Sequence, residues 1–165
     1  MSAALSKLNW RAIIGFELCW FLLVYFQQLA FWPVLAYLLY GLWRLVGTRR
    51  RLAVVIIALL GIAIDSALIQ LDILSFALRD SLPLWFWLLW GVFALAVVEL
   101  LADFLQKPWL AFVLGATGGP LSYIGGAALS GGVLSFPAGY VSYGVLALIW
   151  GGLAVLYGQS RRFYV

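Results

Sequence analysis

The chain has 165 residues, of which 66% are hydrophobic and 10% charged, and its mean hydropathy is +1.09. A soluble domain is about half apolar and about one quarter charged, so a water-soluble protein of this length is excluded. The formal net charge of +4 does not indicate a nucleic-acid partner, because the positive residues cluster at predicted helix ends. The composition predicts an all-α integral membrane protein whose first partner is the lipid bilayer.

Six apolar segments follow one another along the chain and predict six transmembrane helices in a single domain spanning residues 1–165. The second segment is the shortest. Proline near the first turn of the second and sixth segments is typical of a helix start. The predicted spans cover about 10–29, 31–48, 52–75, 84–105, 108–129 and 137–158.

The distribution of positive charge supports six spans. With six crossings, the two termini and the loops at 48–51 and 106–107 share one side of the membrane. That side then holds nine of the ten Lys and Arg residues, and only Arg79 lies on the other. Positive residues favour the cytoplasmic side, so both termini are expected there. The expected interfacial tryptophans are Trp10, Trp43 and Trp109 at the cytoplasmic side and Trp32, Trp85 and Trp87 opposite, whereas Trp20, Trp90 and Trp150 are expected to pack between helices.

Asp65 is the most unusual residue of the predicted membrane interior. It lies thirteen residues beyond the expected start of the third span, which places it roughly 20 Å deep at 1.5 Å per residue. No Lys or Arg is expected at that depth. An intramembrane carboxyl is a candidate functional residue, and Ser66 beside it is included in the candidate site. The alternative is a neutral aspartic acid that joins two helices by hydrogen bonds.

Two other carboxylates are candidate functional residues with simpler alternatives. Glu17 lies roughly 10 Å from the predicted cytoplasmic side, where Arg44 could form a structural ion pair with it. Glu99 could pair with the arginines at 49–51. Asp103 is expected to pair with Lys107 four residues later, and Asp72 to reach water or Arg79.

Missing residue types narrow the possible chemistry. The sequence has no histidine and one cysteine, Cys19, which excludes histidine-based haem ligation and the usual zinc sites. We therefore expect no metal and no cofactor. The absence of an imidazole base also weighs against an enzyme without excluding one.

The stretch "GATGGPLSYIGGA" at residues 115–127 sits inside the fifth predicted span. Gly115 and Gly119 have the spacing that lets helices approach closely. Gly118, Gly119 and Pro120 weaken the helix, since proline removes one backbone hydrogen bond. The sequence therefore predicts either a kink or a true break there. A break would expose backbone amides around Ser122 for ligand binding, and the candidate residues at this point are Gly118, Gly119, Pro120, Ser122 and Tyr123.

The runs "GGPLSYIGGAAL", "KPWLAFVLGA" and "GIAIDSAL" resemble a bacterial inner-membrane family known as domain of unknown function 2878. The resemblance implies six spans in the inner membrane, and it covers most of the chain. It implies an association with genes for enzymes of the cyclopropane-fatty-acid type, but no established activity. Glu99-Leu100 stands where the family usually has an Asn-His pair, so no role for the fourth span carries over.

Three functions remain open at the level of sequence. The leading hypothesis is a non-catalytic accessory protein or subunit that binds lipid or a membrane protein partner. A small proton-coupled transporter, with Asp65 near a helix break at Gly118–Pro120, is the second. A lipid-modifying enzyme that uses Asp65 or Glu17 as acid or base is the third.

Overall fold

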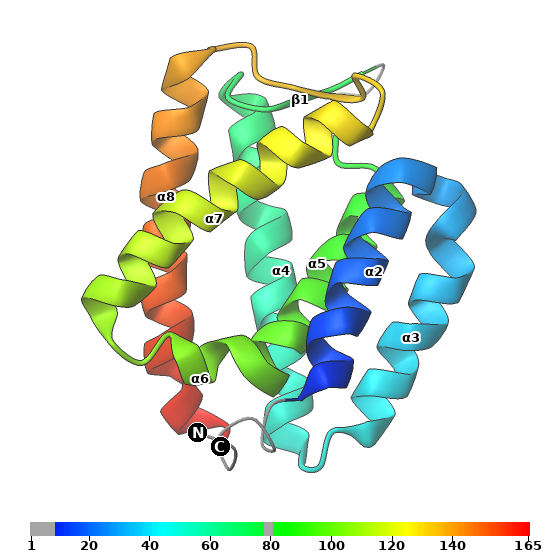
Figure 1. Ribbon diagram of the computed structural model, residues 1–165, viewed down its shortest axis with the longest axis vertical. Coiled ribbons are helices and arrows are strands. Elements are labelled where there is room, and N and C mark those ends of the chain that lie inside the picture. Colours follow the sequence, from blue (N-terminus) through cyan, green and yellow to red (C-terminus); the bar gives the residue numbers. More distant parts are fainter. Residues whose placement is uncertain (1–8, 78–80) are drawn as a thin grey trace.

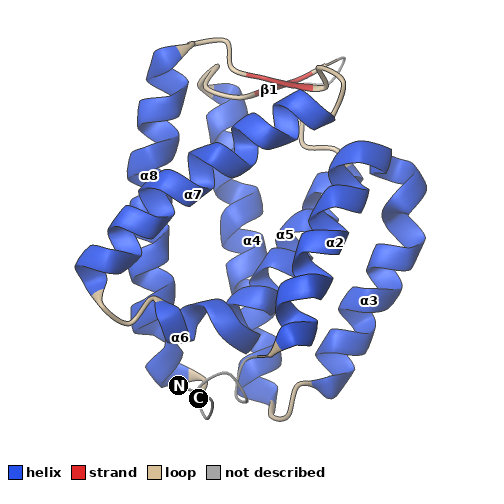
Figure 2. Ribbon diagram, viewed as in Figure 1, coloured by secondary structure: helices blue, strands red, loops and turns tan. Residues whose placement is uncertain are grey.

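The computed structural model describes residues 9–77 and 81–165, so the predictions for Lys7 and Arg79 lie outside the described residues. The described chain is almost entirely helical (Figure 2). Its longer helices are α2 (Trp10–Phe26), α3 (Phe31–Arg44), α4 (Thr48–Gln70), α5 (Leu84–Ala96), α7 (Pro108–Leu129) and α8 (Tyr140–Ser160). Shorter helical turns are η1 (Gln27–Ala30), η2 (Val97–Leu101), α6 (Ala102–Phe104) and η3 (Arg161–Phe163), and the strands are β1 (Ser75–Phe76) and β2 (Leu134–Ser135).

Five helical segments of the described chain are long and apolar enough to cross a membrane. They are Trp10–Arg44, Thr48–Gln70, Leu84–Phe104, Pro108–Leu129 and Tyr140–Phe163. Four of them correspond to the third to sixth predicted spans. The first combines the two spans predicted at 10–29 and 31–48, so the described helices establish a membrane-type helical fold without fixing the number of crossings.

The Trp10–Arg44 segment is not straight. Gln27 adopts a positive φ of 51°, which interrupts the helix, and the chain turns back so that α2 and α3 lie side by side (Figure 1). The Gln27 side-chain amide donates to the backbone carbonyl of Ser130 at 3.2 Å, which ties this turn to the chain beyond α7. At 1.5 Å per residue, the 17 residues of α2 extend roughly 26 Å and the 14 residues of α3 roughly 21 Å.

Two connections, from α4 to α5 and from α7 to α8, contain short strands that the sequence did not predict. The third span was expected to reach residue 75, but α4 ends at Gln70. Asp72 then takes a positive φ of 53°, and β1 pairs antiparallel with β2. The buried Ser142 hydroxyl donates to the carbonyl of Ile73 at 2.7 Å, which anchors this connection to the start of α8.

Helices α7 and α8 form the most extensive helix–helix interface. A side chain at Gly115 or Gly119 would collide with Trp150, and one at Gly151 would meet the Phe112 ring at 2.6 Å. The close approach predicted at Gly115 and Gly119 is therefore observed, and Gly151 takes part in it from α8. Gly144 and Gly152 contribute nothing to it, because no heavy atom lies within 4 Å of an added Cβ.

The predicted helix break is wrong, because α7 runs without interruption from Pro108 to Leu129 with Pro120 inside it. Proline removes only one intrahelical hydrogen bond, and the packing of Gly115 and Gly119 against α8 stabilises the turns on its N-terminal side. The other predicted alternative, a kink of α7 at Gly118–Pro120, stays a prediction.

Tryptophans at the helix ends are mostly exposed, as expected of interfacial anchors. Trp85 is the exception. It is buried and packs edge-on against Phe76 and Phe86, because the β1 connection folds over the start of α5. Trp90 and Trp150 pack between helices, as predicted, with their rings stacked at 5.5 Å.

Candidate functional site

Asp65 lies at the meeting point of α4, α5 and α7. Its carboxylate accepts a hydrogen bond from Trp90 Nε1 at 2.7 Å, and it accepts from the Tyr123 hydroxyl at 2.7 and 2.9 Å on its two oxygens. Only 1% of Asp65 is exposed. One carboxyl thus joins three helices, and each of its oxygens has a donor.

The sequence around Asp65 makes room for these donors. Gly61, one turn earlier on the same face of α4, would collide with the Trp90 ring if it carried a Cβ. Trp150 of α8 stacks on the other side of Trp90 and meets Tyr123 edge-on at 6.0 Å. Asp65 is therefore enclosed by aromatic rings, and we name Asp65, Trp90, Tyr123 and Trp150 the carboxylate cluster.

Ser66 does not join the carboxylate cluster. Its hydroxyl donates to the carbonyl of Ile62 in its own helix at 2.7 Å, a bond that many helical serines make. The structure therefore separates two residues that the sequence placed together, because adjacent helical positions point about 100° apart.

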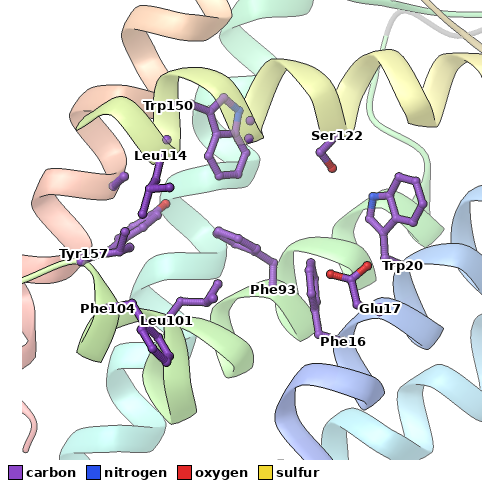
Figure 3. A pocket seen from close by; sticks show the side chains of 15 residues that line it. Phe16, Glu17, Trp20, Phe93, Leu101, Phe104, Leu114, Ser122, Trp150 and Tyr157 are labelled. Atoms are coloured by element: carbon purple, nitrogen blue, oxygen red, sulfur yellow. The ribbon is translucent and has the colours of Figure 1, made fainter. Parts of the chain in front are cut away.

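A cavity of about 480 Å³ lies between α2 and the α7–α8 pair. Its size falls in the range of roughly 300–1,000 Å³ typical of small-molecule sites. Figure 3 shows that its walls come from several helices and are mainly apolar and aromatic. The lining residues are Phe16, Glu17, Trp20, Phe93, Leu101, Phe104, Leu105, Leu114, Gly115, Gly118, Gly119, Ser122, Trp150, Ala154 and Tyr157.

Four of the nine predicted site residues line this cavity. Gly118, Gly119 and Ser122 contribute from α7, and Glu17 contributes from α2. Figure 3 shows the Glu17 carboxylate and the Ser122 side chain projecting toward each other across the cavity. Gly118 has no atom within 4 Å of an added Cβ, so this glycine keeps one wall open. Pro120 is buried and lies outside the lining.

Asp65 lines neither this cavity nor the two small voids of about 40 and 30 Å³ that border Tyr123. A layer of aromatic rings separates it from the large cavity. Phe93 faces the cavity and packs edge-on against both Trp90 and Trp150, at 5.4 and 5.2 Å. The two carboxylates that the sequence grouped together therefore occupy different environments, one dry and bonded and the other facing an open space.

The predicted ion pairs are replaced by others. Glu99 pairs with Arg11, not with the arginines at 49–51, because the π-helical turn η2 lies beside the start of α2. Arg44 does not pair with Glu17; its guanidinium donates to the Tyr40 hydroxyl one turn earlier at 3.2 Å. Arg51 donates to the backbone carbonyls of Leu45 and Trp43, at 3.1 and 3.3 Å.

The ion pair at the C-terminal end also differs from the prediction. Asp103 pairs with Arg161, which follows α8, and not with Lys107. The helix ends at Phe104, so Lys107 is no longer one helical turn away from Asp103. The expected contact of Asp72 with Arg79 lies outside the described residues.

Metal ligands do not gather anywhere in the part of the chain that the structure describes. No group of three or more Cys, Asp or Glu side chains there could hold a metal ion. The single cysteine, Cys19, is buried in the helical core. The chemistry that the described residues offer at the cavity is therefore that of the Glu17 carboxylate, the Ser122 hydroxyl and several aromatic rings.

Sequence reasoning missed two polar aromatic residues. Trp90 was expected only to pack, yet its N–H is a donor to Asp65. Tyr157 was not singled out, although its hydroxyl is buried without a hydrogen-bond partner among the described residues. A signal existed for Trp90, because a deeply placed indole N–H needs an acceptor and Asp65 is the deepest carboxyl in the sequence.

The chain matches one protein family over residues 9–156. That family is described as a protein of unknown function, DUF2878. No curated protein and no solved structure matches the chain. The match covers nearly the whole helical region, which confirms the predicted resemblance. The chain belongs to the family of proteins of unknown function DUF2878.

Proposed function

We propose that this protein is a non-catalytic membrane protein that binds an amphiphile from the bilayer in the cavity between α2 and the α7–α8 pair. The observation that carries the proposal is the cavity itself, about 480 Å³ with mostly apolar walls. All of its lining residues except Leu105 belong to segments long and apolar enough to cross a membrane. A ligand that enters at that depth is most readily supplied by the membrane.

No specific observation supports either of the two alternative functions, a proton-coupled transporter or a lipid-modifying enzyme. The transporter hypothesis placed Asp65 beside a helix break, whereas α7 is continuous and Asp65 lines none of the cavities described above. The enzyme hypothesis needs an acid or base with a hydrogen-bonded partner that shares its site. Glu17 has no such partner among the described residues, and the donors to Asp65 are fixed by packing.

The glycines of α7 and α8 allow a sharp test of cavity binding. An added Cβ has no neighbour within 4 Å at Gly118, which lines the cavity, or at Gly152 on α8, which lies outside the lining, so leucine at Gly118 should fill the cavity and leucine at Gly152 serves as the matched control. We expect the wild-type protein and Gly152→Leu to retain a bilayer-derived molecule in native mass spectrometry. Gly118→Leu should lose it. Equal retention by all three proteins would contradict the proposal.

We also propose that α2 and α3 are separate crossings, so that the chain spans the bacterial inner membrane six times with both ends in the cytoplasm. The reversal at Gln27 and the nine positive residues on the predicted inner side support this topology. Single cysteines at Gln28, Ala138 and Thr48, in a Cys19→Ala background, provide the test. We expect labelling from outside at Gln28 and Ala138 and only after permeabilisation at Thr48. Protection of Gln28 from both sides would contradict six crossings.

A further inference from the structure

Glu17 is a carboxylate that faces the cavity without a partner among the residues that the structure describes. Its side chain is exposed, and no described residue forms an ion pair or hydrogen bond with it. It lies seven residues into α2, roughly 10 Å along the helix. The described residues of the cavity lining include no Lys or Arg, and Arg44, the expected partner, contacts Tyr40 instead.

A negatively charged side chain within the membrane raises the free energy of the protein unless a positive charge compensates it. Charged side chains within the membrane carry an insertion cost of roughly 2.5–3.5 kcal/mol, and they usually pair or mark a ligand pathway. At Glu17 the chain supplies no compensating cation among the described residues. A positively charged group of the ligand would supply it.

The aromatic rings that line the cavity favour the same kind of ligand, and Phe16 and Trp20 lie beside Glu17 (Figure 3). Phe16, Trp20, Phe93, Trp150 and Tyr157 all line the cavity. The faces of aromatic rings carry negative potential and attract organic cations, most strongly when water is excluded. Phe93 is held by a tilted contact to Phe16 at 5.8 Å and an edge contact to Tyr157 at 6.0 Å, so this aromatic wall is preformed.

Tyr157 carries a polar group that makes no hydrogen bond within the described part of the chain. Its hydroxyl is buried, only 2% of the residue is exposed, and it has no hydrogen-bond partner in the described chain. A buried hydroxyl of this kind is uncommon and calls for a partner. Tyr157 lines the cavity from α8 with its ring, but its hydroxyl opens onto almost none of the cavity surface, so the ring and not the hydroxyl contributes to binding.

From these contacts we infer that the cavity selects an amphiphile with an ammonium group, which binds at Glu17 and its aromatic neighbours. The apolar body of the ligand lies along Leu101, Leu105 and Leu114. This inference rests on the proposed function, since it assigns the head group of the same ligand. The ammonium group can belong to a lipid head group or to a free long-chain amine, and both present the same chemistry to Glu17.

Binding to the purified protein in uncharged detergent, measured by native mass spectrometry, tests the inference. The first pair of probes is dodecylammonium and dodecanol, which share a chain but differ in charge. We expect wild-type protein to prefer dodecylammonium by at least about tenfold, the effect of one hydrogen bond to a charged group. Glu17→Gln should abolish the preference while dodecanol still binds, and Glu17→Asp should restore part of it.

A second pair of probes identifies the source of the amine. Phosphatidylethanolamine and phosphatidylglycerol share a glycerophospholipid body, but only the first carries an amine. Preference for phosphatidylethanolamine supports a lipid head group at Glu17. Preference for dodecylammonium with neither phospholipid retained supports a free amine.

The outcomes separate the inference from the proposed function. If wild-type protein and Glu17→Gln bind dodecylammonium and dodecanol equally, and Gly118→Leu binds neither, cavity binding stands and the ammonium inference is overturned. If no probe binds wild-type protein, or Gly118→Leu binds as well as Gly152→Leu, both are overturned. Unfolding curves for each variant exclude loss of fold as the cause.

Discussion

The two intramembrane carboxylates Asp65 and Glu17 differ in what surrounds them. Asp65 is buried at the junction of three helices and accepts hydrogen bonds from Trp90 and Tyr123. Glu17 faces a cavity of about 480 Å³ and has no partner among the described residues. A satisfied buried group stabilises a fold, whereas an unsatisfied group beside open space is available to a ligand. The depth of a carboxylate in the membrane therefore says less about its role than its unused bonds do.

The carboxylate cluster and the cavity also share a wall. Trp150 stacks on Trp90 on one side and lines the cavity on the other. Substitutions that act on one region alone thus test whether the two regions have separate roles. The following predictions use neighbouring or chemically matched residues for that purpose.

The largest loss of stability is expected for Asp65→Leu. The change leaves the Trp90 N–H and the Tyr123 hydroxyl buried without an acceptor, at about 1–3 kcal/mol for each unsatisfied group. The free energy of unfolding in detergent micelles measures the effect, with Asp65→Asn as a milder control because it keeps an acceptor oxygen. A stable Asp65→Leu protein that loses ligand binding would reverse the roles assigned to the two carboxylates.

Adjacent glycines of α7 should respond very differently to the same substitution. Leucine at Gly119 collides with the Trp150 side chain between α7 and α8, and overpacking costs typically about 1–3 kcal/mol. Leucine at Gly118 meets no neighbour and should leave stability nearly unchanged while blocking the cavity. Thermal unfolding of the two variants compares them directly. Equal destabilisation at both positions would contradict the placement of Gly118 beside open space.

Two buried tyrosines provide a smaller contrast. Tyr123→Phe removes a hydrogen bond to Asp65 and should destabilise the protein by about 0.5–1.5 kcal/mol. Tyr157→Phe removes a buried hydroxyl that has no partner among the described residues, so it should be neutral or slightly stabilising in the ligand-free protein. Unfolding of ligand-free protein tests both. A clear destabilisation by Tyr157→Phe would show that the protein itself satisfies this hydroxyl.

The smallest effect on stability is expected for Glu17→Gln. The side chain is exposed to the cavity and makes no described contact that the amide would lose, so the change should stay within about 0.5 kcal/mol. The unfolding free energy measured beside that of Asp65→Leu completes the comparison. A loss of several kcal/mol would assign Glu17 a structural role and remove the basis for ammonium binding.

The sequence predicted much of the helical fold because a long continuous apolar segment satisfies its backbone groups within a membrane by forming a helix. The fifth predicted span, 108–129, coincides with α7, and the fourth ends within one residue of the segment Leu84–Phe104. The turn at Gln27 and the strands β1 and β2 had no comparable signal. A non-glycine residue with positive φ and a two-residue strand pair are set by tertiary contacts.

By itself, the sequence determined the class of the protein, because its composition leaves a helical membrane-type fold as the only way to shield so much apolar surface. It also identified Asp65, Glu17 and the glycines of α7 as unusual residues. Only the tertiary structure decided which carboxylate is hydrogen-bonded and which has no partner among the described residues, since donors such as Trp90 and Tyr123 come from helices far apart in the chain. The position of a residue within an apolar span reports how deep it lies, but helix rotation and packing decide what it touches.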